Sequence, residues 1–314
     1  MGERSNRIMS DIRIGQILAL GTAVCWTLSS IAFEFASRRA GSLPVNFVRL
    51  TLAFIGLTLI GVCGPRHLIW PSDAPASAWK WLLLSGVIGF FVGDLALFRA
   101  FVEIGARLSS LLMALAPPIA ALTAVAMIPE ERMTIRSWLG MTVTLAGVVW
   151  VISERIHDND SAKTIRRATA FGLTLGLIGA AGQGVGTVLA NIGMKSLADP
   201  FAANQIRALA GIVGFFLLIV ATRDLKRIGA SLRDRSALIA LTIGAIAGPL
   251  LGVSMFLKSM ALGVLPGEAS TFAALVPVLI LPILIARGRE HVSWRAALGA
   301  VVAVLGVGIL MWRK

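Results

Sequence analysis

Apolar residues gather along this chain in ten runs, each about as long as a helix that crosses a bilayer. A transmembrane helix needs ~20 consecutive apolar residues, and in lipid its backbone groups must find their hydrogen bonds within the segment. The runs lack the alternation of apolar and polar positions that marks the strands of a membrane barrel. The sequence therefore predicts an all-α integral membrane protein with ten transmembrane helices, at residues 14–34, 44–63, 79–101, 107–128, 137–153, 170–192, 201–222, 236–258, 267–286 and 294–312.

One acid lies well away from the ends of these runs. Asp94 belongs to the stretch GVIGFFVGDLALFRAFVEIG, residues 86–105. An ionised carboxylate at such depth costs at least ~2.5–3.5 kcal/mol on insertion scales, so it needs a partner, a proton or a water-lined cavity. Other charged residues lie near the ends of runs, where we expect them to be hydrated: Glu34, Arg99, Glu103 and Glu268.

The composition leaves little room for a soluble domain. Of 314 residues, 57% are hydrophobic and 14% are charged, with a mean hydropathy of +0.84, whereas soluble domains carry about 25% charged residues. The longest polar connection is residues 154–167. The polar segment 1–13 precedes an apolar run of about 20 residues, which is too long for a signal-peptide core and indicates a first span.

The net charge of +13 does not indicate nucleic-acid binding. The Lys and Arg residues lie in short loops beside apolar runs, which is typical of anchoring against anionic headgroups. His67, His157 and His291 are far apart in loops, and Cys25 and Cys63 lie in apolar runs without metal-ligand spacing. Phosphate-loop, dinucleotide and nucleophile-elbow motifs are absent from the sequence. We therefore expect no enzyme activity, no cofactor and no metal.

The sequence is also an internal duplication. A shift of 158 residues places Asn46 and Arg49 on Asn204 and Arg207. A shift of 159 aligns a longer set of residues, in which Gly89, Gly93, Pro118, Glu131, Gly140 and Gly147 correspond to Gly248, Gly252, Pro277, Glu290, Gly299 and Gly306. The predicted repeats are residues 1–155 and 168–314. Because each holds five spans, an odd number, they must enter the membrane in opposite orientations, as in many secondary transporters.

Loop charges give two conflicting orientations. Counted over the whole chain, Lys and Arg are more numerous on the side away from the termini, mainly in the loops at 154–167, 223–235 and 287–295. By the positive-inside rule this places the termini outside the cell. The first repeat alone indicates the opposite orientation.

Both repeats carry a recurring pattern: an Asn/Arg start to the second span, a Gly-rich third span, a Pro-containing fourth span, then Glu and a fifth span around Leu-Gly. The sequences are ALAPPIAALTAVAMIPEERMTIRSWLGMTVTLAGVVW and FAALVPVLILPILIARGREHVSWRAALGAVVAVLGVGIL. This pattern resembles the EamA family of the drug/metabolite transporter superfamily, and Trp26 fits it too, with Gln183 as its counterpart. The resemblance implies ten helices, cytoplasmic termini in the cell (inner) membrane, and export or exchange of small organic metabolites by alternating access.

Three charged residues within spans are candidates for function. Asp94 is the candidate for substrate binding or for proton or ion coupling, and its alternative is a structural tie between helices. Arg49 and Arg207 each lie one turn after an Asn. A guanidinium binds a carboxylate or phosphate through two parallel hydrogen bonds, so either Arg is a candidate ligand for an anionic substrate or a partner for Asp94. The alternative is snorkelling of the side chain to the headgroups.

Other candidates have structural readings beside the functional ones. Trp26, Gln183 and Asn191 are candidate cavity-lining residues on the first span of each repeat, and for Trp26 packing is the alternative. Small residues at four-residue spacing let membrane helices approach closely, and Pro permits kinks. The residues expected in helix packing or hinges are Gly89, Gly93, Pro118, Gly248, Pro249, Gly252 and Pro277.

These observations predict a secondary transporter, an exporter of small polar metabolites such as amino acids, whose partners are the small-molecule substrate and the lipid bilayer. A homodimer is compatible with the sequence. The alternatives are a sugar-nucleotide or organic-phosphate exchanger, with Arg49 or Arg207 as anion ligand, and a passive channel, for which the sequence offers no continuous polar stripe. A membrane-embedded enzyme would need clustered His, Asp or Cys.

Overall fold

The computed structural model describes residues 2–64, 67–128, 130, 132–158, 169–223, 228, 233–286 and 293–312. Glu131, Glu290 and His291, and the side chain of His157, lie outside the described part of the chain. The described residues form helices and no strands. The first repeat contains α1 (Gly2–Ala40), α2 (Ser42–Cys63), α3 (Ala76–Ser85), η1 (Gly86–Gly93), α4 (Asp94–Met113), α5 (Ala116–Met127) and α6 (Ile135–Asp158). The second contains α8 (Ala170–Met194), α9 (Pro200–Thr222), α11 (Arg235–Ala245), η2 (Ile246–Gly252), α12 (Val253–Ala261), α13 (Pro266–Ala273), α14 (Val276–Ala286) and α15 (Trp294–Met311).

Among the described residues, nine helical segments are long and apolar enough to cross a membrane. They are Arg7–Ser37, Ser42–Cys63, Ala76–Ile104, Ser109–Met127, Ile135–Glu154, Ala170–Met194, Pro200–Thr222, Arg235–Ala261 and Trp294–Met311. Each matches one of the ten predicted runs, to within several residues at the ends. The remaining run, 267–286, overlaps the shorter apolar helix Pro266–Ile280.

Two kinds of interruption recur at equivalent places in the two repeats. The third span of each repeat contains a π-helical segment, η1 and η2, and a shift of 159 residues places the last residue of η1, Gly93, on the last residue of η2, Gly252. The fourth span of each repeat is broken at 114–115 and at 274–275. Pro118 and Pro277 lie in the first turn of the helix after each break, where a missing N–H costs nothing. These two prolines therefore start helices instead of kinking them, whereas Pro249 lies inside η2.

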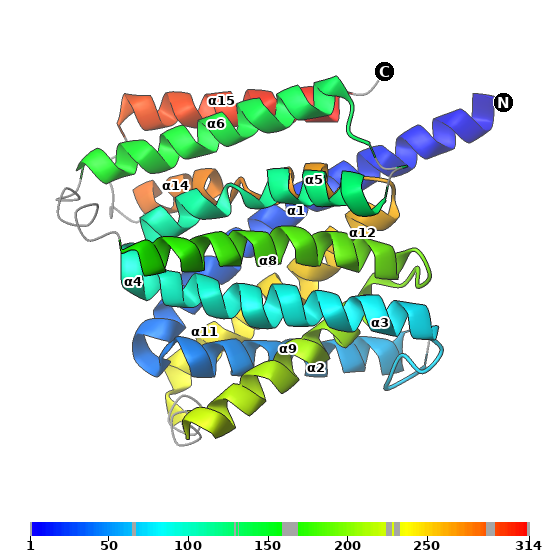
Figure 1. The fold of residues 1–314 in the computed structure, drawn as a ribbon, viewed down its shortest axis with the longest axis vertical. Coiled ribbons are helices and arrows are strands. Elements are labelled where there is room, and N and C mark those ends of the chain that lie inside the picture. The colour runs from blue at the N-terminus through cyan, green and yellow to red at the C-terminus, as the bar shows by residue number, and fades with distance from the viewer. Residues whose placement is uncertain are drawn as a thin grey trace.

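The helices pair across the two repeats in a reciprocal way (Figure 1). α1 packs on α11, η2 and α12 of the second repeat, and α8 packs on α3, η1 and α4 of the first. α2 packs on α9, α5 on α13, and α6 on α15. In Figure 1, α6 and α15 lie together at the top, and the ends marked N and C lie on the same side of the molecule. The third spans, with their π-helical segments, are therefore covered by the other repeat.

Candidate functional site

Asp94 lies at the junction between η1 and α4, and it is 7% exposed. The π-helical turn that ends at Gly93 widens the helix just before this residue. π-helical turns within α-helices are frequent at functional sites. Gly93 and Gly182 of α8 approach so closely that a side chain on Gly182 would meet the Cα of Gly93 at 2.7 Å. The glycines thus let α8 come near enough for its side chains to reach Asp94.

Two side chains from neighbouring helices bind the Asp94 carboxylate. Arg49 of α2 donates a hydrogen bond from Nη2 to Oδ2 and forms an ion pair. Gln183 of α8 donates from Nε2 to Oδ1 at 2.8 Å and to the Gly89 carbonyl oxygen at 3.3 Å. The second contact ties Gln183 to η1. A buried charge in a protein is normally paired and hydrogen-bonded, and Asp94 meets both conditions.

A second arginine lies beside this ion pair. Arg207 of α9 is 4% exposed, and its guanidinium lies over the ring of Phe90 at 4.5 Å from the ring centroid. It interacts electrostatically with Asp94, but none of the described residues forms a hydrogen bond with its Nε. Arg49 is also held by aromatic rings, with Phe33 at 5.3 Å and Phe98 at 5.5 Å. Burial of Arg207 inside the protein contradicts the snorkelling alternative for this residue.

The four polar residues Asp94, Arg49, Gln183 and Arg207, called here the charge cluster, come from both repeats. α2 and α4 of the first repeat supply Arg49 and Asp94, and α8 and α9 of the second supply Gln183 and Arg207. The cluster therefore lies at the interface between the repeats. Two guanidinium groups against one carboxylate leave an excess of one positive charge.

The equivalent place in the other repeat is apolar. Val253 stands where the repeat places Asp94, and Trp26 stands opposite as the counterpart of Gln183. The Trp26 ring packs on Phe256, with centroids 5.7 Å apart, and a side chain on Gly252 would meet its Cδ1 at 2.7 Å. Gln183 and Trp26 thus make equivalent contacts on η1 and on the η2–α12 junction, but only the first is polar.

Other polar candidates lie outside the charge cluster. Asn204 donates from Nδ2 to the Pro249 carbonyl oxygen at 2.7 Å and to Ser254 Oγ at 3.0 Å, so it binds α9 to the proline-containing turn of η2. Gly248 packs against Ser29, whose Oγ would lie 2.8 Å from a Cβ there. Asn191 is buried in α8, about two turns after Gln183.

Glu268 differs from the expectation of a hydrated acid at the end of a span. It is fully buried in the first turn of α13, and Ser137 of α6 donates a hydrogen bond to its Oε1 at 2.5 Å. The reason is that α13 begins inside the helix bundle, against α5 and α6. Sequence position near an apolar run does not reveal this, because burial there depends on which helices cover the end.

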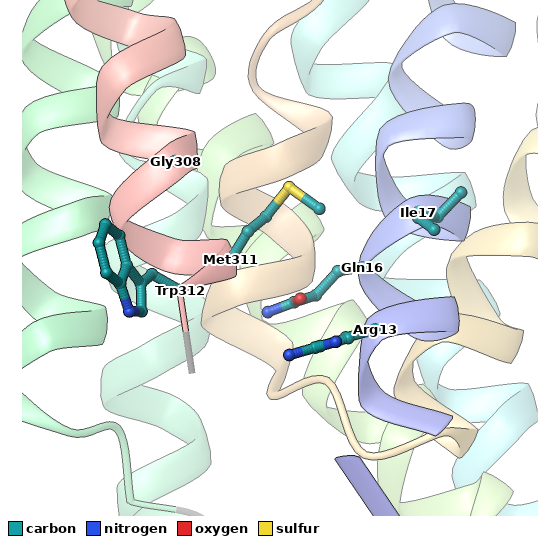
Figure 2. A pocket seen from close by; sticks show the side chains of 6 residues that line it. All are labelled: Arg13, Gln16, Ile17, Gly308, Met311 and Trp312. Atoms are coloured by element: carbon teal, nitrogen blue, oxygen red, sulfur yellow. The ribbon is translucent and has the colours of Figure 1, made fainter. Parts of the chain in front are cut away.

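A cavity of about 450 Å³ opens at the end of the bundle that carries both termini (Figure 2). Arg13 and Gln16 extend into it from α1 toward the end of α15, as Figure 2 shows, and Gln16 donates to the Leu310 carbonyl oxygen at 3.2 Å. The cavity is lined by Arg13, Gln16, Ile17, Gly308, Met311 and Trp312. None of the predicted site residues lines it. Among the described residues, no group of three His, Cys, Asp or Glu side chains gathers as a metal ion requires.

The nine long apolar helices found in the described part of the chain, with buried charges between them, define a multi-pass helical membrane protein. Its sequence matches the EamA-like transporter family twice, at residues 13–153 and 170–312. The chain therefore belongs to the EamA-like transporter family, whose members are membrane transporters of the drug/metabolite transporter superfamily.

The comparison with solved structures supports the fold. One matching chain, described only as "Crystal structure of protein", has a TM-score of 0.68 and 16% sequence identity, over 94% of this chain and 96% of that one. At this identity the likeness concerns the fold alone. No curated protein matches the sequence.

Proposed function

We propose that this transporter exports small polar organic metabolites, such as amino acids, across the cell (inner) membrane by alternating access. The observation that carries the proposal is the buried charge cluster, which is shared between the two repeats. Intramembrane ionisable residues are costly and usually mark substrate or ion pathways. In transporters built from repeats, the substrate site lies at the interface between them.

Ten membrane crossings in two inverted five-helix repeats, residues 1–155 and 168–314, are the architecture that suits this mechanism. The reciprocal packing of α1 and α8 on the third spans of the opposite repeat supports it. So do the paired π-helical segments and the paired breaks in the fourth spans. Under this proposal the helix pairs rock around a cavity bordered by the first, third and fourth spans of each repeat. Cytoplasmic termini are part of the proposal, in keeping with the family resemblance, although the whole-chain loop charge favours the opposite orientation.

Asp94 is the proposed substrate-binding or coupling acid. Its ion pair with Arg49 joins α2 to α4, and its bond to Gln183 joins α4 to α8 across the repeat interface. A proton or a substrate cation at Asp94 weakens the attraction to Arg49, and loss of that attraction frees α2 from α4. Occupation of the site and the movement of helices are thereby linked.

The test is transport by the purified protein in liposomes, with a panel of radiolabelled amino acids. Saturable uptake is expected, and Asp94→Asn should change its pH dependence because the titratable carboxyl is gone. Asp234→Asn, at an exposed acid outside the spans, is the matched control. Unchanged transport kinetics at every pH in Asp94→Asn would remove Asp94 from the mechanism. If that variant folds poorly, the double variant Asp94→Asn/Arg49→Gln removes both partners of the ion pair.

The same assay separates the alternatives. A passive channel gives flux that rises with concentration without saturating. An organic-phosphate or sugar-nucleotide exchanger, with Arg49 or Arg207 as the anion ligand, gives uptake only when liposomes are preloaded with a phosphorylated counter-substrate.

A further inference from the structure

Arg207 carries a buried positive charge for which the surrounding protein supplies no hydrogen-bonded anion. The described part of the chain offers no hydrogen bond to its Nε and no ion pair to its guanidinium. The nearby carboxylate of Asp94 is already bound by Arg49 and Gln183. Asp94 attracts Arg207 only through space, and a buried charge without a hydrogen-bonded counter-charge is costly, so an anion from outside the protein would stabilise the site.

The surroundings of the guanidinium fit a flat oxyanion. One face lies on the ring of Phe90. The edge of the guanidinium faces Gly89. A Cβ added to Gly89 would lie 3.6 Å from Arg207 Nη2, 3.7 Å from the Gly182 carbonyl oxygen and 3.8 Å from the Gly186 Cα. Three glycines thus place no side chain along this edge. A guanidinium edge binds a carboxylate through two parallel hydrogen bonds.

The charge count distinguishes a carboxylate from a phosphate ester. With Asp94 ionised in its pair with Arg49, and guanidinium groups that stay protonated in proteins, the cluster has one positive charge in excess. A carboxylate neutralises it. A phosphate ester carries about −1.5 to −2 charges at pH 7 and would leave a net negative charge in a buried site.

We infer that Arg207 binds the carboxylate of the transported metabolite, which makes the substrates carboxylate-bearing compounds such as amino acids and not phosphate esters. This inference rests on the proposed transport function and names the substrate group at the same site. The ammonium group of an amino acid is attracted by Asp94, where it competes with Arg49.

Binding is measured as thermal stabilisation of the detergent-purified full chain, since a ligand that binds only the folded state raises apparent stability. The probes are L-amino acids, their primary amides, the matching decarboxylated amines and glucose 6-phosphate, at constant pH and ionic strength. The amino acids should stabilise the protein, and the other probes should not. Arg207→Gln should weaken amino-acid binding roughly ten- to a hundredfold, and Arg207→Lys should retain part of it. Arg39→Gln, at an exposed ion pair, is the control and should bind normally.

Several outcomes would overturn the assignment: equal stabilisation by amides or amines, preference for the phosphate ester, a response to chloride alone, no response to any carboxylate, or full amino-acid binding by Arg207→Gln. If Arg207→Gln does not fold, carboxylate binding by Gly89→Ala tests the inference in its place. Its methyl group meets only ordinary contacts of 3.6 Å and longer, yet it occupies the space beside Nη2, so unchanged carboxylate binding would contradict the inference.

Liposome transport separates this inference from the proposed function. Carboxylate binding without transport would leave the Arg207 site standing and remove the transport function. Transport of metabolites that lack a carboxylate, unaffected by Arg207→Gln, would leave the transport function standing and remove the Arg207 site.

Discussion

At the residue scale, the charge cluster is asymmetric because the single carboxylate of Asp94 interacts with two guanidinium groups. Removing one partner of a buried ion pair typically costs 3–5 kcal/mol, since the other charge is left uncompensated. Asp94→Asn leaves both Arg49 and Arg207 without an acid, whereas Arg49→Gln leaves Asp94 beside Arg207. The two partners of the same ion pair are therefore not equivalent.

We expect Asp94→Asn to lower the free energy of unfolding by about 3–5 kcal/mol and Arg49→Gln to lower it by less. Unfolding of the detergent-solubilised protein, followed by circular dichroism, measures both. The double variant should lose less than the sum of the single losses, because the two groups interact directly. Equal effects of the two single substitutions would contradict the role of Arg207 as a second cation for Asp94.

A second acid, Asp234, shows the opposite situation just before the apolar segment Arg235–Ala261. Its carboxylate accepts hydrogen bonds from the N–H groups of Ala237 and Ser236 as the N-cap of α11, and Arg39 of α1 binds it at 3.0 Å. The Ala237 N–H, followed by Arg39, holds the pKa of the Asp234 carboxyl below its ordinary value. A depressed folded-state pKa gives stability that is present above the unfolded pKa of about 3.9 and lost as pH falls through the folded value.

Asp234→Asn should therefore reduce the loss of stability on acidification below about pH 4, because Asn keeps the cap but does not titrate. Asp234→Ala should be less stable than Asp234→Asn at neutral pH, since it also loses the cap. Melting temperatures between pH 3 and pH 7 test both statements. The side chain is about a third exposed (33%), so the contribution of Arg39 should shrink in high salt.

At the element scale, glycines set the distance between paired helices. α6 and α15 approach so closely that a side chain on Gly147 would clash with the backbone of Ala303, and one on Gly306 with the backbone of Thr144. These two glycines correspond under the repeat. Backbone atoms cannot move aside as the end of a flexible side chain can. The distance between α6 and α15 therefore depends on the absence of a side chain at Gly147 and Gly306.

Gly306→Ala should consequently destabilise the protein by about 1–3 kcal/mol through overpacking. Gly308, two residues later on α15, is the matched control, because a Cβ there meets nothing within 4 Å. Gly308→Ala should be neutral or slightly stabilising, since Ala is favoured over Gly in a helix by up to about 1 kcal/mol. Similar melting temperatures for the two variants in detergent would show that close approach of α6 and α15 does not contribute to stability.

At the scale of the whole molecule, the helices and the members of the charge cluster were predictable, but the full set of contacts between those members was not. Nine apolar runs became long helices because lipid leaves the backbone no other way to satisfy its hydrogen bonds. The π-helical segments and the broken fourth spans recur at the period of the repeat, although neither feature was predicted from the sequence. The partners of Asp94 lie 45 and 89 residues away along the chain, so only helix packing brings them together. The same holds for the burial of Glu268.

The number of crossings remains a prediction with a direct test. The apolar helix Pro266–Ile280 is shorter than the nine other segments, and α14, which overlaps its end, contains Pro282. If this part of the chain crosses the membrane, there are ten crossings and both termini lie on one side; if it does not, the termini lie on opposite sides.

Epitope tags at the two ends, probed with protease on intact and on inverted vesicles, should become accessible together. An impermeant maleimide should label Ala198→Cys from the side of the termini and Ser161→Cys from the other side, after replacement of Cys25 and Cys63 by Ala. Termini accessible from opposite sides would contradict the arrangement of two inverted five-helix repeats. In that case η1 and η2 would not be equivalent segments of two inverted repeats.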